Sequence, residues 1–234
     1  MSIAADAPSN RGRVGRPRSI PYTGAASGRE QLLEAAAYLF TERGFAATST
    51  RMISGRAGIR QASIYYHFSG GKDQILAELL GQSVRPTLSK IAQIEQVAPP
   101  TTALYLLALV DVSTLVTAPH NIGMLYRLPD VTRRPGFEEF LQARCELTAA
   151  YGRLGSAIAQ STVVDLVGPE RLGEILIQVV DSVINLRSAG QTVDKRTANS
   201  VAAACVRICG SSNEQIALAA TAAGRLVHEV RGDA

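Results

Sequence analysis

The sequence predicts an all-α protein, with three short N-terminal helices followed by a larger C-terminal bundle of longer helices. Two observations carry this prediction. Apolar residues recur at intervals of three and four along most of the chain, which places them on one face of a helix. Each break in that pattern coincides with Gly, Pro, Ser or Asn, the residues that punctuate helices. With 234 residues and a hydrophobic content of 46%, the chain is long enough to bury a substantial core.

The first helix begins at a recognisable cap. Residues 27–30 read SGRE, a capping box in which Ser27 is the N-cap and Glu30 occupies the third helical position. The apolar residues that follow share one stripe, and Gly44 ends the helix in the place of a left-handed cap. The stripe consists of Leu32, Leu33, Ala36, Ala37 and Phe40.

Two shorter helices are expected next. One covers about 50–57, with Ser49 as its N-cap, and Gly58 turns the chain at its end. The other covers 61–68. Together these two helices and the turn between them have the layout of a helix-turn-helix unit.

From residue 72 onward the breaks define longer elements. A helix over 72–97 is interrupted by Pro86, because proline removes a backbone donor and clashes with the preceding turn. The segment STVVDLVG, residues 161–168, is expected to be a connector. The remaining prediction is helices over 101–117, 120–128, 137–159, 169–188, 194–209 and 213–230, and a loop over 129–136.

Positive charge is concentrated in the first third of the chain. Residues 1–75 hold ten Lys and Arg against five Asp and Glu, a net charge of +5, whereas the rest has a net charge of −1. Such a distribution is typical of a chain whose N-terminal part meets a polyanion. Residues 1–27 are expected to be a flexible basic arm, which either lies in the minor groove of DNA or remains a solvated tail. Its groove-binding residues would be Arg11, Arg13, Arg16 and Arg18.

Several kinds of site and location are not expected. The three cysteines lack the spacing of a disulfide framework, so Cys205 and Cys209 are interpreted as small buried apolar residues rather than a metal or redox pair. The longest apolar run, 103–110, is much shorter than the roughly 20 residues of a membrane span. No signal peptide is recognisable. We therefore expect a cytoplasmic protein with no membrane partner, no metal and no cofactor.

The helix over 61–68 carries many hydrogen-bonding side chains. On a helical projection, Ile64 and Phe68 share the inward side. The remaining surface offers small and polar groups without a carboxylate, and Arg60 precedes it. The major groove of DNA accepts a helix end of this kind. The alternative is that the polar ends of these side chains simply face water while the helix covers a small three-helix core. The residues outside the inward side are Gln61, Ala62, Ser63, Tyr65, Tyr66 and His67.

Residues 29–80 resemble the N-terminal domain of TetR-family transcriptional regulators. The similarity rests on LLEAAAYLFTERGFAATSTRMISGRAGIRQASIYYHF, followed by Lys72–Asp73 and the apolar Ile75–Leu76. It implies that Gln61, Ala62 and Ser63 approach base edges. It implies contacts mainly with backbone phosphates for Ser49, Arg51, Tyr65, Tyr66, His67 and Lys72. Thr50 and Arg60 complete the expected DNA-binding set.

The chain departs from the family pattern at two places. Met52 stands where the family often has an acid three residues after the cap of the second helix, so the capping box is lost there. SerGlyGly precedes Lys72 where the family usually has Pro and one further residue, which leaves the start of the fourth helix open. The resemblance implies a helix-turn-helix DNA-binding domain over 28–80 and a helical ligand-binding and dimerisation domain over 81–234.

Two C-terminal helices predict self-association. The helix over 170–188 is apolar on more than one side, and the helix over 213–230 is similarly rich in Ala, Leu and Val. We expect a homodimer through a four-helix interface, with a helix central to one subunit's own bundle as the alternative. A two-fold dimer would bind a palindromic operator of double-stranded DNA.

The remaining helices are expected to enclose a pocket for an unknown small-molecule effector. The expected function is a repressor that the effector releases from DNA, and the alternative is an architectural DNA-binding protein of low specificity. An enzyme is not expected and no catalytic residue is assigned, because no GxSxG, HExxH or nucleotide-binding glycine loop occurs. The residues expected to line the pocket are Tyr105, His120, Met124, Tyr126, Arg127 and Cys145.

Overall fold

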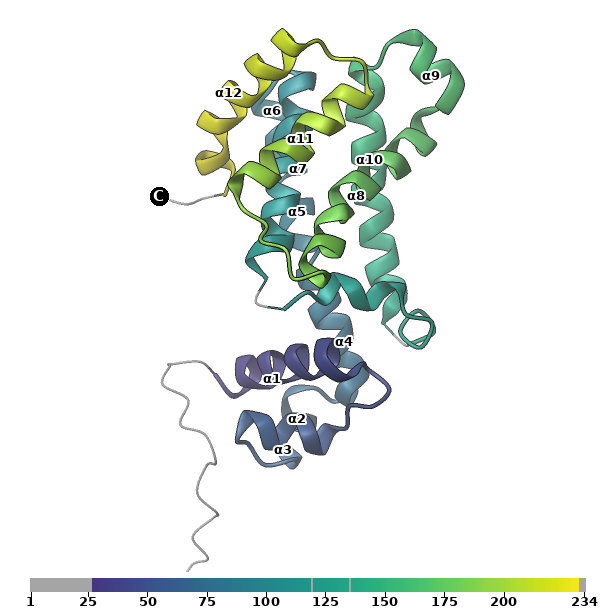
Figure 1. The fold of residues 1–234 in the computed structure, drawn as a ribbon. Helices are drawn as coiled ribbons and strands as arrows, with labels where there is room; N and C mark the ends of the chain where they lie inside the picture. Colours follow the sequence, from purple (N-terminus) through teal and green to yellow (C-terminus); the bar gives the residue numbers. More distant parts are fainter. Residues whose placement is uncertain (1–26, 119, 135, 232–234) are drawn as a thin grey trace, which may run out of the picture.

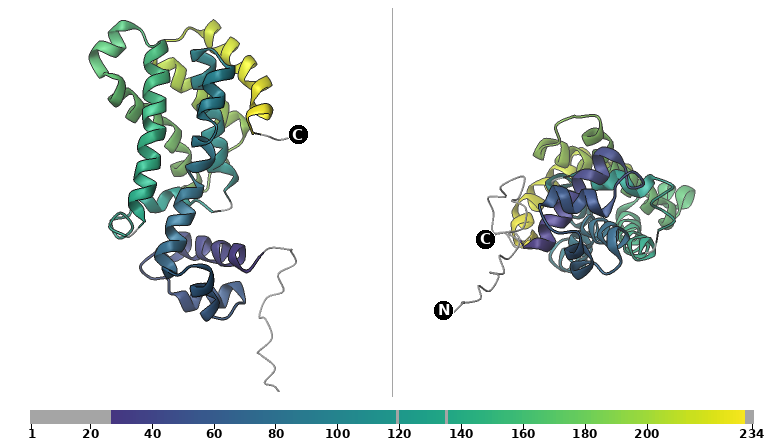
Figure 2. Two further views of the ribbon diagram at one scale, coloured as in Figure 1. Left: turned by 180° about the vertical axis from the view of Figure 1, so that it is seen from behind. Right: turned by 90° about the horizontal axis from the view of Figure 1, so that it is seen from below.

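The structure, a computed structural model, describes residues 27–118, 120–134 and 136–231 (Figure 1). Over these residues the chain is helical and contains no strand, which confirms the predicted fold class. The first three helices lie at one end of an elongated molecule, and α4 leads from them into the bundle (Figure 1). Figure 2 shows the same separation from behind. These helices are α1 (Gly28–Arg43), α2 (Thr50–Ala57), α3 (Ala62–His67) and α4 (Gly71–Gln82).

The cap of α1 forms as predicted. The Ser27 hydroxyl accepts from the Glu30 backbone at 3.3 Å, and the Glu30 carboxylate accepts from the Ser27 backbone at 2.7 Å. Gly44 ends the helix with a positive φ of 81°, but its ψ of 159° lies outside the left-handed helical region. The prediction of a left-handed cap is therefore wrong in detail, although only glycine adopts this backbone conformation readily.

Three helices occupy the segment 72–97 and its flanks. After α4 come α5 (Arg85–Leu88) and α6 (Ile91–Val97). Pro86 lies in the first turn of α5. Backbone amides in the first turn have no partner within the helix, so the amide hydrogen that proline lacks costs no helical hydrogen bond. The proline therefore interrupts the long helix by starting a new one.

The C-terminal bundle is built around α7. Its side chains are buried on most sides, and it packs against four other long helices as well as α5 and α6. By length and hydropathy α7 could cross a membrane, but 61% of it is buried inside the protein, as expected of a core helix. The bundle consists of α7 (Pro100–Thr117), the 3₁₀ helix η1 (Ile122–Arg127), α8 (Phe137–Ile158), α10 (Pro169–Ser188), α11 (Lys195–Ile208) and α12 (Asn213–Arg231).

The connector predicted over 161–168 is wrong, because Ser161–Val167 forms the short helix α9. Its valines lower helix propensity only slightly, and its backbone groups have no neighbouring strand with which to pair. They bond within the segment instead, ending with the Gly168 amide on the Val164 carbonyl at 2.9 Å. None of its residues is buried, and Leu166 is 86% exposed.

Helices α8 and α10 approach each other through glycines. A Cβ atom added at Gly173 would lie 2.4 Å from the Thr148 carbonyl oxygen, and one added at Gly152 would lie 2.6 Å from the Pro169 carbonyl oxygen. The two helices therefore touch backbone to backbone at this crossing.

Two of the three cysteines are buried, in agreement with the prediction of small apolar residues. Cys205 and Cys209 are both fully buried, and Cys145 is exposed. Burial raises the pKa of the Cys205 thiol to about 12 and that of the Cys209 thiol to about 11. Both thiols are therefore protonated and unreactive near neutral pH.

Candidate nucleic-acid interface

The packing of the N-terminal helices determines which face of α3 is free. Ile64 and Phe68 are fully buried, so the inward side of α3 is the predicted one. They belong to one core with the fully buried Leu32, Phe40, Phe45 and Ile53. The polar side of α3 is consequently turned away from the protein.

The N-terminus of α2 is capped by one side chain. The Ser49 hydroxyl accepts from the Met52 backbone at 3.2 Å, which confirms the predicted cap. Met52 has no oxygen to return a bond to the Ser49 backbone, so the reciprocal half of a capping box is lost as expected. Ser49 and Arg51 are exposed beside the first turn of α2, where unpaired backbone amides favour an anion.

A side-chain hydrogen bond joins α2 to the tip of α3. The Gln61 amide donates to the Thr50 hydroxyl at 3.2 Å. Gln61 and Ala62 are exposed, and Ser63 is half-buried. The three predicted base-reading positions therefore lie at the exposed N-terminal end of α3, with Gln61 held by a residue of the preceding helix.

The two adjacent tyrosines are among the most exposed aromatic residues of the described chain. Tyr66 is 86% exposed and Tyr65 is 54% exposed. The Tyr66 ring lies edge-on to His67, with ring centroids 5.0 Å apart. His67 is half-buried and lies near the start of α1, so it has less freedom than Tyr66 to meet a ligand. Large exposed aromatic side chains with hydroxyl tips suit contacts with a phosphate backbone.

Lys72 is placed differently from the prediction. Its ammonium donates to the carbonyls of Phe45 and Thr48 at 2.9 and 2.8 Å, and lies 4.2 Å from the centroid of the Phe45 ring. Burial, and then the neighbouring Arg134, lower the pKa of Lys72. Two of its three donors are thus used to hold the loop before α2, which gives Lys72 a positioning role, and its contact with a phosphate stays a prediction.

The start of α4 explains why Lys72 can reach this loop. Gly71 has a φ of +62° and begins α4, and the backbone amide of Gly70 is bound by the Gln74 side chain at 3.0 Å. The additional glycine relative to the family pattern is therefore absorbed in a tight turn. Lys72 follows immediately, in the first turn of α4.

Lys72→Ala is expected to lower the free energy of unfolding by about 2 kcal/mol, because two hydrogen bonds from a charged donor are lost. DNA affinity should fall similarly for all sequences, since α2 loses its brace. The slope of log affinity against log salt should change by much less than one unit. Arg51→Ala, the matched control, should reduce that slope by about one. Equal slope changes in both variants would return Lys72 to the phosphate contacts.

The charge of this surface is uniform in sign. From residue 43 to residue 72 the chain has five Lys or Arg and no Asp or Glu. Arg51, Arg56 and Arg60 are exposed. The Arg56 guanidinium lies 3.3 Å from the centroid of the Tyr38 ring, which holds it against α1. The predicted arm residues Arg11, Arg13, Arg16 and Arg18 lie outside the described residues.

The six residues predicted to line an effector pocket have different surroundings in the described part of the chain. Tyr105 is buried in α7 and donates to the Asn199 side chain at 2.9 Å, and Cys145 is exposed on α8. Met124 is half-buried in η1. His120 lines a separate cavity between the N-terminal helices and the bundle. That these six residues line one effector pocket stays a prediction.

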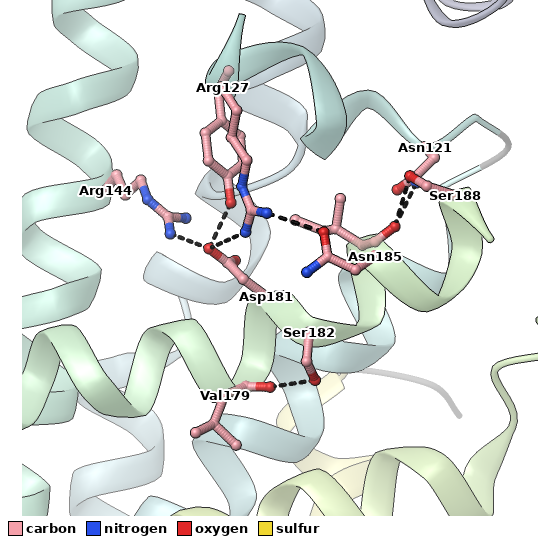
Figure 3. A network of polar contacts seen from close by, with 10 residues as sticks. Asn121, Arg127, Arg144, Val179, Asp181, Ser182, Asn185 and Ser188 are labelled. Atoms are coloured by element: carbon pink, nitrogen blue, oxygen red, sulfur yellow. Dashed lines mark hydrogen bonds and ion pairs between the residues drawn. The ribbon is translucent and has the colours of Figure 1, made fainter.

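Tyr126 and Arg127 take part in a buried polar cluster instead (Figure 3). Tyr126 donates to the Asp181 carboxylate at 2.5 Å, Arg144 pairs with the same oxygen, and Arg127 lies 3.8 Å from it. Asp181 has an exposed fraction of 2%, so this carboxylate is compensated by partners from η1 and α8. Burial, and then the charge of Asp181, raise the pKa of Tyr126.

A second buried carboxylate was not assigned from the sequence. Asp111 of α7 accepts from the Tyr151 hydroxyl at 2.9 Å and from the Thr87 hydroxyl at 3.3 Å. Burial raises the pKa of Asp111 to about 7, against the lowering effects of those hydrogen bonds and of Arg144. Asp111 and Asp181 each interrupt an otherwise apolar stretch of a core helix. A single charged residue in such a stretch is the sequence signal of a buried carboxylate.

Comparisons with known proteins agree on the N-terminal domain. Residues 32–79 match the family model described as bacterial regulatory proteins, tetR family. The transcriptional repressor KstR2 of Mycolicibacterium smegmatis is 46% identical over 55 residues, which are 24% of this chain and 26% of that protein. The transcriptional regulator LmrA of Bacillus subtilis is 38% identical over 64 residues, 27% of this chain and 34% of LmrA. The chain thus matches between a quarter and a third of the length of these relatives.

Solved structures extend the similarity over most of the chain. AmtR of Mycobacterium smegmatis is 34% identical, with a TM-score of 0.76, and the alignment covers 88% of this chain and 98% of AmtR. The fatty acid degradation regulator FadR of Bacillus halodurans is 17% identical with a TM-score of 0.63, covering 82% and 99%, and shows the fold alone. The curated relatives KstR2 and LmrA are transcriptional regulators. The chain therefore belongs to the tetR family of bacterial regulatory proteins.

Proposed function

We propose that the protein is a cytoplasmic transcriptional repressor, which binds a palindromic operator as a homodimer and is released by a small-molecule effector. The observation that carries this proposal is the surface of α2 and α3, defined by residues 49–67. It is exposed at one end of the molecule, rich in hydrogen-bonding groups and free of carboxylates. A surface of this composition suits a major groove flanked by phosphates.

In the proposed complex the N-terminal end of α3 enters the major groove. Gln61 is the side chain best suited to a base, because an amide can bind adenine through two hydrogen bonds. Ser49 and Arg51 at the start of α2, and Tyr66 of α3, are placed to bind the phosphates on either side. These contacts would fix the orientation of α3, while Gln61, Ala62 and Ser63 would carry the sequence preference.

The proposed dimer uses the surfaces of α10 and α12. Most apolar residues of α10 are buried within the subunit, but Ile175 remains 37% exposed, and Leu218 of α12 is 64% exposed. Exposed apolar side chains on long helices favour association with a second copy. A two-fold axis through this surface would present two α3 helices to half-sites about one helical turn of DNA apart, or a multiple of it.

Release by an effector would follow from a shift in population. In one conformation of the dimer, the distance between the two N-terminal domains fits the operator. A ligand that binds more tightly to a conformation with another distance lowers the population that can bind DNA. The ligand must bind the two states with different affinity for this to occur.

The test of the proposed function is selection of genomic and random DNA by the purified protein at one fixed, near-physiological salt concentration. Enrichment of a palindrome supports the dimeric repressor, and its position in the genome identifies the regulated genes. Binding without enrichment would favour an architectural protein of low specificity. A complete absence of binding to DNA would overturn the proposal.

Gln61→Ala is expected to weaken binding to the selected operator by about 1–3 kcal/mol and to relax the preference at one base position per half-site. The affinity for unrelated DNA should change little, because phosphate contacts are kept. Repeating the selection with the variant measures both effects. Gln142→Ala, on the exposed surface of α8, is the matched control. An unchanged preference matrix would show that another residue reads the base.

A further inference from the structure

A cavity of about 310 Å³ lies where the N-terminal helices meet the bundle. One wall consists of residues of α1 and the C-terminal end of α4. The other consists of the segment that follows α7 and the first residue of η1. The cavity is thus bounded on one side by α1 and α4, which pack near the DNA-binding surface, and on the other by the C-terminal domain.

The lining combines carboxylates with apolar side chains. Glu30 and Glu34 lie one turn apart on α1, and none of the described lining residues is a Lys or Arg. The His120 Nε2 atom lies 2.8 Å from the Glu34 carboxylate and comes from the opposite wall. The apolar part of the lining includes Leu33, Leu79 and Ile122, which are almost completely buried. A ligand that fits must therefore offer an apolar body and a group that carboxylates attract.

One guanidinium lies close to the cavity without lining it. Arg187 of α10 donates to the Leu115 and Ala118 carbonyls, at the C-terminal end of α7. It stabilises that helix end from the bundle side, where a cation offsets the helix dipole. Ala118 lines the cavity, but the described lining includes only the two glutamates and His120 as ionisable groups.

We propose that this cavity binds an organic cation, namely a protonated amine attached to a compact apolar group. The ammonium would donate charge-assisted hydrogen bonds to Glu34 and Glu30, and the apolar group would lie against Leu33, Leu79 and Ile122. An anion of the same shape would be repelled, and a neutral analogue would lose the charge-assisted bonds. This binding does not require a separate effector site in the core of the C-terminal domain.

The position of the cavity gives the ligand a route to the DNA-binding surface. The η1 wall is fixed to α10, since the Asn121 side chain donates to the Ile184 carbonyl at 2.8 Å and to the Ser188 hydroxyl at 2.9 Å (Figure 3). Gly123 lies so close to Ile184 that a Cβ atom there would come within 2.6 Å. The α1 wall is tied across the junction by His120. A ligand that competes for Glu34 would loosen this tie and change the position of α1.

The experiment measures binding to the full chain without DNA, by calorimetry at fixed pH and salt. The probes are phenethylammonium, the neutral 2-phenylethanol and the anionic phenylacetate. Phenethylammonium is expected to bind at least about tenfold more tightly than the alcohol, and phenylacetate the most weakly. Equal affinities of the three probes, or no saturable binding of the ammonium, would overturn the proposal.

Variants place the ligand in the cavity. Glu34→Gln keeps the shape and should weaken phenethylammonium binding about tenfold. Glu30→Gln should weaken it as well while keeping a capping box. Glu42→Gln, exposed at the end of the same helix, should leave it unchanged. Similar effects of Glu34→Gln and Glu42→Gln would place the ligand elsewhere.

The proposed cation site rests on the proposed function only for the effect of the bound cation on operator binding. The binding isotherms require no DNA, so a failed operator selection would overturn the repressor without affecting the cavity. Conversely, a selected palindrome together with no ammonium binding would overturn the cavity site and leave the repressor standing.

Discussion

Gly173→Ala is expected to destabilise the protein by at least about 2 kcal/mol, even after the gain of about 1 kcal/mol that alanine brings to a helix interior. The reason is the backbone contact between α8 and α10. The new Cβ atom would lie 2.4 Å from the Thr148 carbonyl oxygen and 3.0 Å from the Gly152 nitrogen, and neither atom belongs to a flexible side chain. The two helices would have to move apart, which would disturb the Arg144–Asp181 pair nearby on the same two helices.

Equilibrium unfolding in urea, at one protein concentration, measures this loss. Gly224→Ala in α12 is the matched control, because a Cβ atom there meets nothing within 4 Å. That variant should gain roughly 0.5–1 kcal/mol. If Gly173→Ala were as stable as the control, α8 and α10 could not be in close backbone contact at this residue.

Asp111→Asn is expected to be more stable than the unsubstituted protein at pH 8, by up to about 4 kcal/mol, and equally stable near pH 4. The pKa of Asp111 is about 7 in the folded protein, raised mainly by burial from its ordinary value near 3.8. Between these values the folded state binds a proton that the unfolded state has lost. Stability therefore falls as the pH rises from about 4 to 7 and levels off above.

The measurement is urea unfolding of both proteins at several pH values from 4 to 8, and the quantity of interest is their difference. Asparagine keeps an acceptor for the Tyr151 hydroxyl but cannot ionise. Asp165→Asn, on the exposed surface of α9, controls for a general change of charge. A substituted protein that is less stable at pH 8 would mean that Asp111 is ionised and stabilised by Arg144.

The N-terminal domain could be predicted from the sequence because its signals are local. The Ser27 cap, the Ser49 cap and the inward pair of α3 each depend on residues within one or two turns. The structure also places Gln61 at the exposed end of α3, as the helical projection implies.

Contacts between distant segments could not be predicted in the same way. Lys72 binds carbonyls 24 and 27 residues away, and that choice depends on how α4 packs against the loop before α2. Asp181 finds Arg144 and Tyr126 only because α8, α10 and η1 meet in the folded bundle. Helix α9 could not be predicted either, because a short segment with three valines is compatible with a connector as well as with a helix.

The central position of α7 has a consequence for how the protein fluctuates. Since this helix packs against α8, α10, α11 and α12, exposing its backbone requires most of the bundle to open at once. Helices α1, α2 and α3 are not among the helices that pack closely on α7, so we expect them to open at a lower free-energy cost than the bundle. The N-terminal helices are therefore expected to unfold and refold many times while the C-terminal bundle stays folded.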